Sequence, residues 1–343
     1  MPRTISSPVI PAHKSLTKGA FTGPVSAADV LQASKRIAPY IIRTPLIYSR
    51  ALSQQTGAEV WLKLENLQNT GSFKIRGAAN RILQLSAEER KRGIITVSSG
   101  NHGRAVARVA QETGIAATIC LSTLVPENKV EAIRSYGANV HVAGNSQDEA
   151  QEEAERLIRE KGLVWISAFD DLAIITGQGT IGLEIMQDMP DCEIIMAPLS
   201  GGGLLAGIAL ATKSISSYTR IIGVSMEIEP GMVRSLEAGK PVNVDEHPSL
   251  ADALGGSIGL DNRYTFPYIR DYMDEAVLVS EASLAPALRY TFENEGLVIE
   301  GGSATVIAAL CDGKIGDIKG KKIAVVLSGR NISTDKVIKA LTD

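Results

Sequence analysis

Residues 69–78 read Asn69-Thr70-Gly71-Ser72-Phe73-Lys74-Ile75-Arg76-Gly77-Ala78. Ser72 is a residue type favoured at helix N-caps, and no proline follows it for dozens of residues. A helical spacing of small and apolar residues continues through Ala78, Ala79, Ile82 and Leu83. We therefore predict a helix that has Ser72 as its N-cap and Lys74 near its second position.

A lysine in the first turn of a helix has two interpretations. The helix dipole and the unpaired N–H groups disfavour an ammonium there, and burial would lower the pKa of Lys74 further. An amine with a lowered pKa is a nucleophile near neutral pH, which predicts a lysine that forms a Schiff base. The alternative is a surface lysine whose ammonium lies in water. This stretch alone does not decide between them.

Length and charge favour a two-domain protein that acts on small molecules. The chain has 343 residues, about twice the size of a usual domain. Charged residues make up 21% of it, and its formal net charge is -3. This composition provides neither the basic field that nucleic acid requires nor a strongly acidic one. The expected partners are therefore small molecules.

The cysteines and histidines indicate neither a disulfide framework nor a histidine-rich metal site. The cysteines lie far apart without a CxxC pair, at positions Cys120, Cys192 and Cys311. No two of the four histidines have the spacing of helical metal ligands. A reducing cytoplasm is therefore the expected location, and metal chemistry is not the first expectation.

No part of the sequence predicts a membrane span. No apolar run approaches the roughly twenty residues that a bilayer requires. Residues 1–24 contain basic residues and no acidic one, but prolines interrupt them and the apolar core of a targeting peptide is missing. We expect a loosely ordered tail that is available to pack on a partner subunit.

Short β-branched runs alternate with longer amphipathic stretches from residue 27 nearly to the end, which is typical of an α/β protein. The expected strands are 93–97, 117–121, 139–142, 164–166, 193–196, 220–224 and 322–327. The expected helices include 127–136, 148–161, 174–189 and 204–213. The predicted fold is two doubly wound, parallel-type sheets with flanking helices.

The βα units between residues 89 and 170 are expected to form one small domain. No low-complexity linker interrupts the pattern, so the chain is expected to leave one domain, build the other and return. This predicts a large domain of residues 1–88 and 171–343 and a small domain of residues 89–170. Ligands of open parallel sheets bind at the carboxyl ends of strands, so the turns that follow strands are the candidates for a site.

One of these turns, Ser200-Gly201-Gly202-Gly203-Leu204, is typical of a phosphate-binding loop. Three glycines between a strand and a helix let backbone N–H groups approach an anion, with the helix dipole behind them. The turn lacks the GK[ST] of a Walker loop and the GxGxxG of dinucleotide sites, so a phosphate smaller than a dinucleotide is expected. The alternative is a tight turn that requires glycine only for packing.

Two further turns place polar side chains at strand ends. Ser98-Ser99-Gly100-Asn101-His102-Gly103 offers hydroxyls and an amide that can donate to a phenolate or carboxylate, or that simply cap a helix. His102 is expected to pack or to form a structural hydrogen bond. In Ser328-Gly329-Arg330-Asn331, the hydroxyl of Ser328 can meet a ring nitrogen or be an ordinary turn serine.

A helix-start lysine, a glycine-rich phosphate loop and polar strand-end turns together suit pyridoxal phosphate. The stretches that carry a family resemblance are 72–78, 98–103, Gly177-Gln178-Gly179-Thr180, 200–204 and 328–331. This set resembles the fold-type II pyridoxal phosphate enzymes, whose fold is like that of the tryptophan synthase β-subunit. Within them, the chain is most similar to the threonine/serine dehydratase and serine racemase group. The resemblance runs from about residue 27 to residue 340.

The resemblance implies a set of cofactor-binding residues. Lys74 would hold pyridoxal 5'-phosphate and act as the base at the substrate's α-carbon. Phe73 would pack against the cofactor ring, Asn101 would donate to its phenolic oxygen, and Ser328 would meet its pyridine nitrogen. The N–H groups that bind the phosphate would be those of Gly201, Gly202, Gly203 and Leu204. A neutral partner at the pyridine nitrogen suits elimination better than transamination.

The resemblance also implies substrate-binding residues. Ser99 would exchange a proton on the opposite face of the ring. The substrate carboxylate would bind in the turn formed by Ser98, Ser99, Gly100, Asn101 and His102. Arg330 stands where the common dehydratases have a small residue. It would hold a second substrate carboxylate or, as an equal alternative, form a salt bridge on the wall.

The function implied is that of a cytoplasmic pyridoxal phosphate dehydratase, which removes water from a β-hydroxy amino acid to give a keto acid and ammonia. The alternatives are an amino acid racemase and a β-replacement synthase. From a different class, a non-catalytic protein that binds a phosphate ligand stays open. The family leads us to expect a homodimer or a higher homo-oligomer.

Three positions bear on the narrower assignment. Ser225 stands where racemases and many dehydratases have a metal-binding glutamate, so the metal is left open, although Glu227 is nearby. Glu300 matches a family position near the ring. Residues 249–264 and 328–331 resemble the branch of hydroxyectoine-utilisation dehydratases, which implies a substrate derived from hydroxyectoine. The alternative is a general dehydratase for threonine, serine or hydroxyaspartate that has the same loop for packing reasons.

Overall fold

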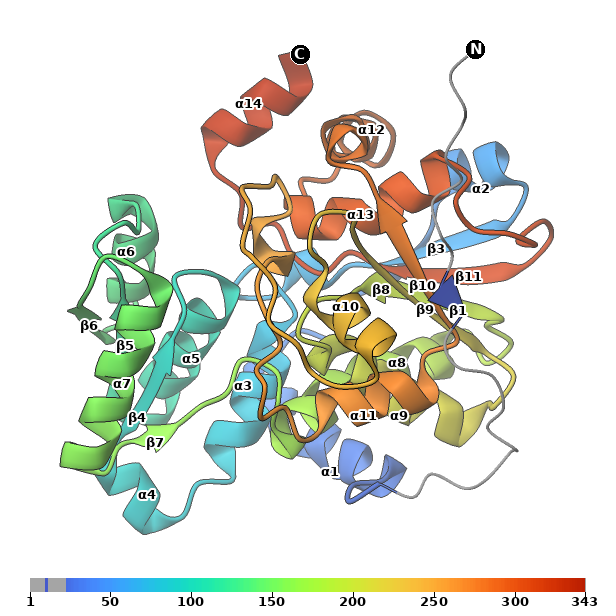
Figure 1. Cartoon of the computed structure of the whole chain (residues 1–343). Helices are drawn as coiled ribbons and strands as arrows, with labels where there is room; N and C mark the ends of the chain where they lie inside the picture. The colour runs from blue at the N-terminus through green and yellow to red at the C-terminus, as the bar shows by residue number, and fades with distance from the viewer. Residues whose placement is uncertain (1–9, 12–22, 343) are drawn as a thin grey trace.

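Two β-sheets organise the chain, which the computed structural model describes over residues 10–11 and 23–342 (Figure 1). The larger sheet has the strand order β1 (Ile10–Pro11), β10 (Glu275–Val279), β9 (Arg220–Met226), β8 (Ile194–Pro198), β11 (Lys322–Val326), β3 (Glu59–Lys63) and β2 (Leu46–Tyr48). Its inner strands run parallel, and the edge strands β1 and β2 run antiparallel to their neighbours. The smaller sheet consists of parallel strands in the order β6 (Asn139–Val142), β5 (Ala117–Leu121), β4 (Ile94–Val97) and β7 (Val164–Trp165). The predicted α/β class with two parallel-type sheets is confirmed.

Helices cover both faces of the larger sheet, because successive side chains of its inner strands point to opposite faces. Ile195 and Ala197 of β8 face one hydrophobic core, and Ile194 and Met196 face the other. The first core is completed by α1 (Ala27–Ile37), α8 (Leu172–Asp188), α9 (Gly203–Ile215), α10 (Gly231–Ala238) and α11 (Thr265–Tyr272). The second is completed by α2 (Arg50–Thr56), α12 (Leu284–Glu295), α13 (Gly301–Cys311) and α14 (Thr334–Thr342). Strand β8 is therefore buried on both sides, which is why its sequence is apolar throughout.

The smaller sheet has cores of its own. On one face pack α3 (Lys74–Leu83), α5 (Asn101–Thr113) and α6 (Glu127–Arg134), and α7 (Gln147–Lys161) covers the other. The short helix α4 (Ala87–Arg92) leads into β4, and 3-10 helices form at Ala38–Tyr40, Glu65–Leu67, Asp252–Leu254 and Glu281–Ser283. Helix α3 also packs on α8, where a Cβ on Gly177 would lie 2.7 Å from the carbonyl oxygen of Arg76. Helix α3 therefore lies between the two sheets, and it carries Lys74 at its first position.

The start of α3 differs from the prediction. Lys74 is the first residue of the helix, and its N-cap is Phe73, without a side-chain cap. Ser72 instead forms a β-bridge with Gly329, and its hydroxyl is buried without a hydrogen-bond partner among the described residues. The prediction of Ser72 as N-cap is therefore wrong. Pairing with a distant turn delays the helix, and local propensity does not report such pairing.

The predicted strands and helices are otherwise present, with ends that differ by at most two residues. The sequence does not predict β1, β2, β3 or β10. Strand β3 ends at Lys63, which is fully buried and pairs with Glu184 of α8 at 2.6 Å. From the local sequence, a lysine at a strand end is expected to be exposed. Only its distant partner makes the burial of Lys63 possible.

Within residues 10–11 and 23–342, no helix is long and apolar enough to cross a bilayer. The tail expected at residues 1–24 lies almost entirely outside the described residues. The structure therefore leaves that expectation as it stands.

Candidate active site

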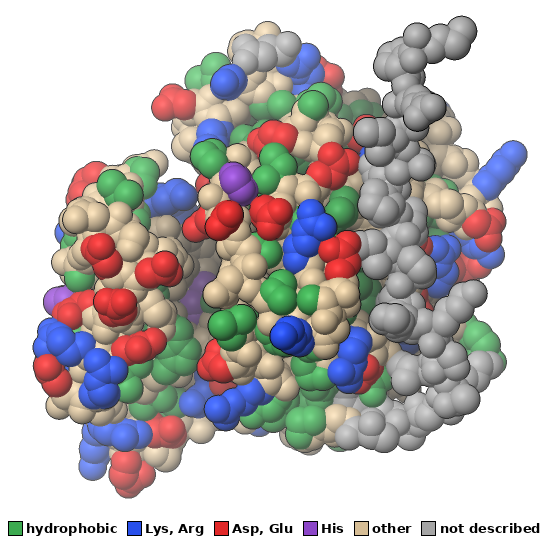
Figure 2. Space-filling model, viewed as in Figure 1, with side chains coloured by type: hydrophobic (Ala, Val, Ile, Leu, Met, Phe, Trp, Pro, Cys, Tyr) green, Lys and Arg blue, Asp and Glu red, His purple; other side chains and the backbone are tan. Residues whose placement is uncertain are grey.

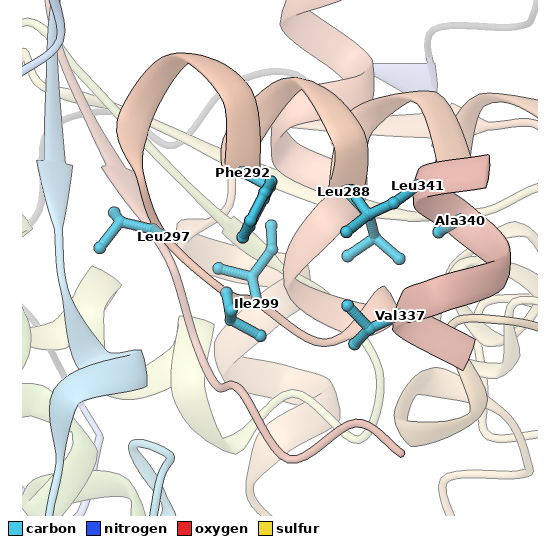
Figure 3. Close-up of a pocket in the computed structure, with 8 residues that line it drawn as sticks. Leu288, Phe292, Leu297, Ile299, Val337, Ala340 and Leu341 are labelled. Atoms are coloured by element: carbon cyan, nitrogen blue, oxygen red, sulfur yellow. The ribbon is translucent and has the colours of Figure 1, made fainter. Parts of the chain in front are cut away.

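A cavity of about 420 Å³ is lined by the start of α3 and by the turns that follow β4, β8 and β11. Figure 2 shows the surface hollowed between the part built around the smaller sheet and the rest of the molecule. A second groove, between α12 and α14, has an entirely apolar lining (Figure 3), formed by Leu288, Phe292, Leu297, Val298, Ile299, Val337, Ala340 and Leu341. The first cavity brings amine, amide, hydroxyl and carboxylate groups together. It is therefore the candidate active site.

Lys74 lies at the wall of this cavity. Its Nζ donates to the carbonyl oxygen of Ala168 at 2.7 Å and lies 5.3 Å from the centroid of the Phe73 ring. Burial lowers the pKa of Lys74 from 10.5 to about 8, and the charge of Glu300 opposes this effect. The amine thus lies in the cavity and not in bulk water, and it loses its proton much closer to neutral pH than an ordinary lysine does.

The turn after β11 holds the start of α3 in place. The backbone N–H of Phe73 donates to the carbonyl oxygen of Ser328 at 3.0 Å, next to the bridge between Ser72 and Gly329. Ser328 is itself buried and lines the cavity. The lysine and the serine that sequence reasoning places on the same cofactor are therefore brought together by backbone pairing.

Arg330 does not line the cavity. It is exposed, and its Nη1 donates to the carbonyl oxygen of Asn66 at 2.7 Å, while its backbone N–H donates to Gly71 at 2.8 Å. The side chain thus contacts a backbone carbonyl. Both the substrate-binding interpretation and the salt-bridge alternative would have placed it on a carboxylate. The structure supports a role for Arg330 in holding the loop before Lys74.

The glycines after β8 form another wall and begin α9. Gly203 is the first residue of α9, and its N-cap Gly202 has a φ of 87°. A Cβ on Gly201 would lie 2.5 Å from the Phe169 ring, and one on Gly202 would lie 2.8 Å from Cε of Met232. The loop therefore requires glycine for packing. The first N–H groups of α9 also lack partners within the helix, so the same loop offers donors to an anion.

The turn after β4 lines the cavity with Ser98, Ser99, Gly100, Asn101 and His102. Helix α5 begins at Asn101 with Gly100 as its N-cap and no side-chain cap, so the alternative of a capping Ser99 or Asn101 is wrong. His102 Nε2 lies 3.1 Å from the carbonyl oxygen of Ile166. Burial, aided by the charge of Lys74, lowers the pKa of His102 to about 3. His102 is therefore neutral and forms a structural hydrogen bond, as predicted.

Asn101 belongs to a chain of side-chain hydrogen bonds. Its Nδ2 donates to Oε1 of Glu300 at 2.7 Å, and its Oδ1 accepts from Nδ2 of Asn331 at 2.6 Å. Oδ1 of Asn331 accepts in turn from Nη1 of Arg104 at 3.0 Å. Burial raises the pKa of Glu300 to about 7. Sequence reasoning assigned no role to Arg104 or Asn331; the available signal for Arg104 was its position one turn after Asn101 on α5.

A buried network of charges anchors α3. The guanidinium of Arg76 is fully buried and pairs with Glu65 at 2.7 Å and with Glu184 at 2.6 Å. Lys63 pairs with Glu184 as well, but burial lowers its pKa nonetheless. Burial alone would raise the pKa of Glu184, whereas Arg76 and Lys63 lower it. Since Arg76 follows Lys74 by two residues, the network ties the reactive end of α3 to β3 and α8.

No cluster of three or more His, Cys, Asp or Glu side chains that could hold a metal ion occurs among residues 23–342. Ser225, where the resemblance led us to expect a metal-binding glutamate in related enzymes, is buried in β9 opposite Leu278. Glu227 lies 3.7 Å from the ammonium of Lys314.

The groups around the cavity fit pyridoxal phosphate. The half-buried amine of Lys74 suits an aldehyde, and the start of α9 suits a phosphate dianion. Asn101 has a second amide N–H beyond the one that Glu300 accepts, and Ser328 offers a neutral hydroxyl. The Phe73 ring provides an apolar surface beside the amine.

Comparison with known proteins points to the same cofactor. Residues 37–329 match the family model described as pyridoxal-phosphate dependent enzyme. The chain is 51% identical over 308 residues to a putative threonine dehydratase of Sinorhizobium fredii, and this match covers 90% of the chain and 92% of the relative. It is 43% identical over 313 residues to an L-threonine ammonia-lyase of Thermotoga maritima, and this match covers 91% of the chain and 77% of the relative. Its structure is similar to that of maize serine racemase, with a TM-score of 0.87 and 32% identity. The match covers 93% of this chain and 97% of the racemase chain.

Proposed function

Because the chain belongs to the family of pyridoxal-phosphate dependent enzymes and has threonine dehydratases among its relatives, we propose that it removes water from a β-hydroxy amino acid to give a keto acid and ammonia. Its cofactor is pyridoxal 5'-phosphate, and it is a lyase of the threonine dehydratase group. The observation that carries the proposal is the cavity in which the Lys74 amine, the 201–204 loop and the 98–103 turn meet.

Lys74 would act twice, as the residue that holds the cofactor and as the base. When bound, pyridoxal phosphate withdraws electrons from the substrate's α-carbon and so makes its α-proton removable. The free amine of Lys74 would take that proton, and the ammonium so formed could give a proton to the departing β-hydroxyl, which would leave as water. Hydrolysis of the released enamine by water would then give the keto acid and ammonia. A pKa of about 8 supports this role, since the neutral amine is accessible near neutral pH. The carbonyl oxygen of Ala168 orients the amine from 2.7 Å away.

The remaining residues would position the reactants. Loop 201–204 would bind the phosphate through backbone N–H groups, and Phe73 would pack against the ring. Asn101 and Ser328 would contact its phenolic oxygen and its nitrogen. The start of α5 would bind the substrate carboxylate, with hydroxyls from Ser98 and Ser99 and free N–H groups from the first turn. Ser99 would exchange a proton on the face opposite Lys74.

An amino acid racemase is the second candidate. The similarity to maize serine racemase favours it, as does the presence of Lys74 and Ser99 in one cavity, where the pair could move a proton between two faces. A β-replacement synthase would form a new amino acid when a thiol is supplied. A non-catalytic phosphate-binding protein would convert no amino acid at all.

A substrate panel tests the proposal. Threonine, serine, hydroxyaspartate and a hydroxy amino acid derived from hydroxyectoine are incubated with the loaded enzyme, and keto acid, ammonia and loss of optical purity are measured. We expect equal amounts of keto acid and ammonia from at least one of them. Racemisation without ammonia release would favour the racemase. If the loaded protein releases ammonia from no β-hydroxy amino acid, the dehydratase proposal is wrong.

The lowered pKa of Lys74 predicts how cofactor capture depends on pH. An amine attacks an aldehyde in its neutral form, so the rate of capture by the cofactor-free protein should rise with pH and level off above about pH 8. An ordinary lysine would still gain rate up to its pKa of 10.5. Stopped-flow absorbance measures the rate. A midpoint near the ordinary value would contradict the burial of this amine.

The glycine loop predicts a specific loss of cofactor affinity. Gly202→Ala places a Cβ at a φ of 87° and 2.8 Å from Met232, so we expect cofactor binding to weaken by about 10–100-fold. Titration of the cofactor-free protein measures the dissociation constant. Gly239→Ala is the matched control, because Gly239 has a φ of 70° and no atom within 4 Å of its added Cβ. Equal affinities of the two variants would show that the loop does not bind the cofactor.

We also propose a homodimer in the cytoplasm, with a large domain of residues 1–88 and 171–343 and a small domain of residues 89–170. The two separate sheets support this division. The cysteines Cys120, Cys192 and Cys311 are unpaired, which suits a reducing compartment. Light scattering of the purified protein tests the oligomeric state.

A further inference from the structure

We propose that Arg104 is a positioning residue, which sets the orientation of the Asn101 amide through Asn331. The inference rests on the proposed function, where Asn101 donates to the phenolic oxygen of the cofactor. Arg104 lies one turn after Asn101 on α5 and lines the cavity together with Asn331. Its Nε is buried without a hydrogen-bond partner among the described residues, and its Nη1 donates to Asn331. The hydrogen bond from Nη1 therefore anchors this guanidinium on the side-chain amide of Asn331.

The side-chain amide of Asn331 has only one favourable orientation. Its Nδ2 donates to the carbonyl oxygen of Thr70 at 2.9 Å and to Oδ1 of Asn101 at 2.6 Å. Its Oδ1 accepts from Arg104 at 3.0 Å. A carbonyl oxygen can only accept and a guanidinium can only donate. A reversed amide would therefore set acceptor against acceptor at Thr70 and donor against donor at Arg104.

Asn331 passes this orientation on to Asn101. Because Asn331 presents an N–H, Asn101 must present its oxygen, and its Nδ2 then faces Oε1 of Glu300 at 2.7 Å. The second N–H of Asn101 has no partner in this chain of hydrogen bonds, and Asn101 lines the cavity. A donor is therefore available where the phenolic oxygen is proposed to bind. A reversed Asn101 would present an oxygen instead.

The charge of Arg104 favours the ionised, accepting form of Glu300. Glu300 is the buried N-cap of α13 and accepts from the side chain of Asn101 and from the backbone N–H of Asn331 at 3.2 Å. Burial and Asp252 raise its pKa, whereas the contacts with Asn101 and Asn331 and the charge of Arg104 lower it. Lys74 also faces it.

Loss of the Arg104 charge would let Glu300 bind a proton at a higher pH. A protonated Glu300 can donate to an Asn101 oxygen, which is the contact that the reversed amide would need. One cation that only donates therefore stabilises both links of the chain, from Asn331 through Asn101 to Glu300.

Two substitutions separate donor character from shape. Arg104→Gln removes the charge and can also accept, whereas Arg104→Lys remains a cation that only donates. The readouts are the absorbance of the bound cofactor across pH, its dissociation constant and kcat/KM. For Arg104→Gln we expect weaker absorbance of the yellow form, in which the cofactor is bound to Lys74. We also expect a shift of the pH at which this absorbance changes and about a tenfold loss of kcat/KM. Arg104→Lys should keep the wild-type spectrum, as should the control Arg108→Gln, one turn further along α5.

Each outcome is decisive. A wild-type spectrum and pH transition in Arg104→Gln would overturn the proposal. So would an Arg104→Lys variant as altered as Arg104→Gln, because shape and not donor character would then matter. If Arg104→Gln unfolds at a lower temperature, the spectrum of Arg104→Lys provides the test: a wild-type spectrum supports the proposal, and an altered one overturns it. Failure of the proposed function is seen separately, since a wild-type protein that makes no keto acid still gives the cofactor spectrum.

Discussion

Lys74→Ala is expected to lower kcat/KM for the best β-hydroxy amino acid by at least about 10³-fold. The substitution removes the amine that holds the cofactor and the base that takes the α-proton. Loop 201–204 and the ring contacts stay in place, so the variant should still bind the cofactor without a covalent bond. Release of keto acid and ammonia is measured on preparations with equal cofactor content.

A second lysine provides the control for this experiment. Lys91 is exposed on α4, and Lys91→Ala should keep wild-type activity. Added methylamine should restore part of the activity of Lys74→Ala, because a small amine can occupy the space left by the side chain. An Lys74→Ala enzyme within tenfold of the wild type would show that another group acts as the base.

The second large effect is on stability. Arg76→Met is expected to lower the free energy of unfolding by about 3–5 kcal/mol, because it leaves the carboxylates of Glu65 and Glu184 buried without their shared partner. Urea titration of the cofactor-free protein at constant pH measures the change without a contribution from ligand binding.

Arg156→Met is the matched control. Arg156 pairs with Glu153 at 2.7 Å and also with Glu160, but all of these contacts are on the exposed surface of α7. Its loss should cost less than about 1 kcal/mol. If Arg76→Met costs no more than Arg156→Met, the network under α3 does not anchor that helix, and a separate support for Lys74 must exist.

The meeting of distant turns within one sheet could be predicted from the sequence, because it follows from a topological rule. Lys74, Asn101, the 201–204 loop and Ser328 all line one cavity, although more than 200 residues of chain separate the first from the last. Parallel strands bring the turns after their carboxyl ends to the same edge of a sheet, which accounts for the 201–204 loop and Ser328 after β8 and β11. Asn101 follows β4 of the smaller sheet, so its place in the cavity also depends on how the two sheets pack. The alternation of strands and helices that establishes this rule is a local pattern.

Features that depend on a single distant partner could not be predicted. Ser72 is not an N-cap because Gly329 pairs with its backbone, and β3 ends in a buried Lys63 because Glu184 neutralises it. Arg330 lies outside the cavity because its side chain bonds to Asn66. The role we infer for Arg104 depends likewise on Asn331, which is far away in the sequence. No local propensity or spacing reports these partners.

The proposed function depends on a covalent bond between Lys74 and pyridoxal phosphate. Borohydride reduction of the loaded protein, followed by peptide mass spectrometry, tests it directly, because reduction fixes the cofactor to the lysine that holds it. We expect one modified lysine per chain, in the peptide that contains Lys74, and none in Lys74→Ala. Label on another lysine, such as the buried Lys63 or the cavity-lining Lys129, or no label on a protein that binds the cofactor, would contradict it.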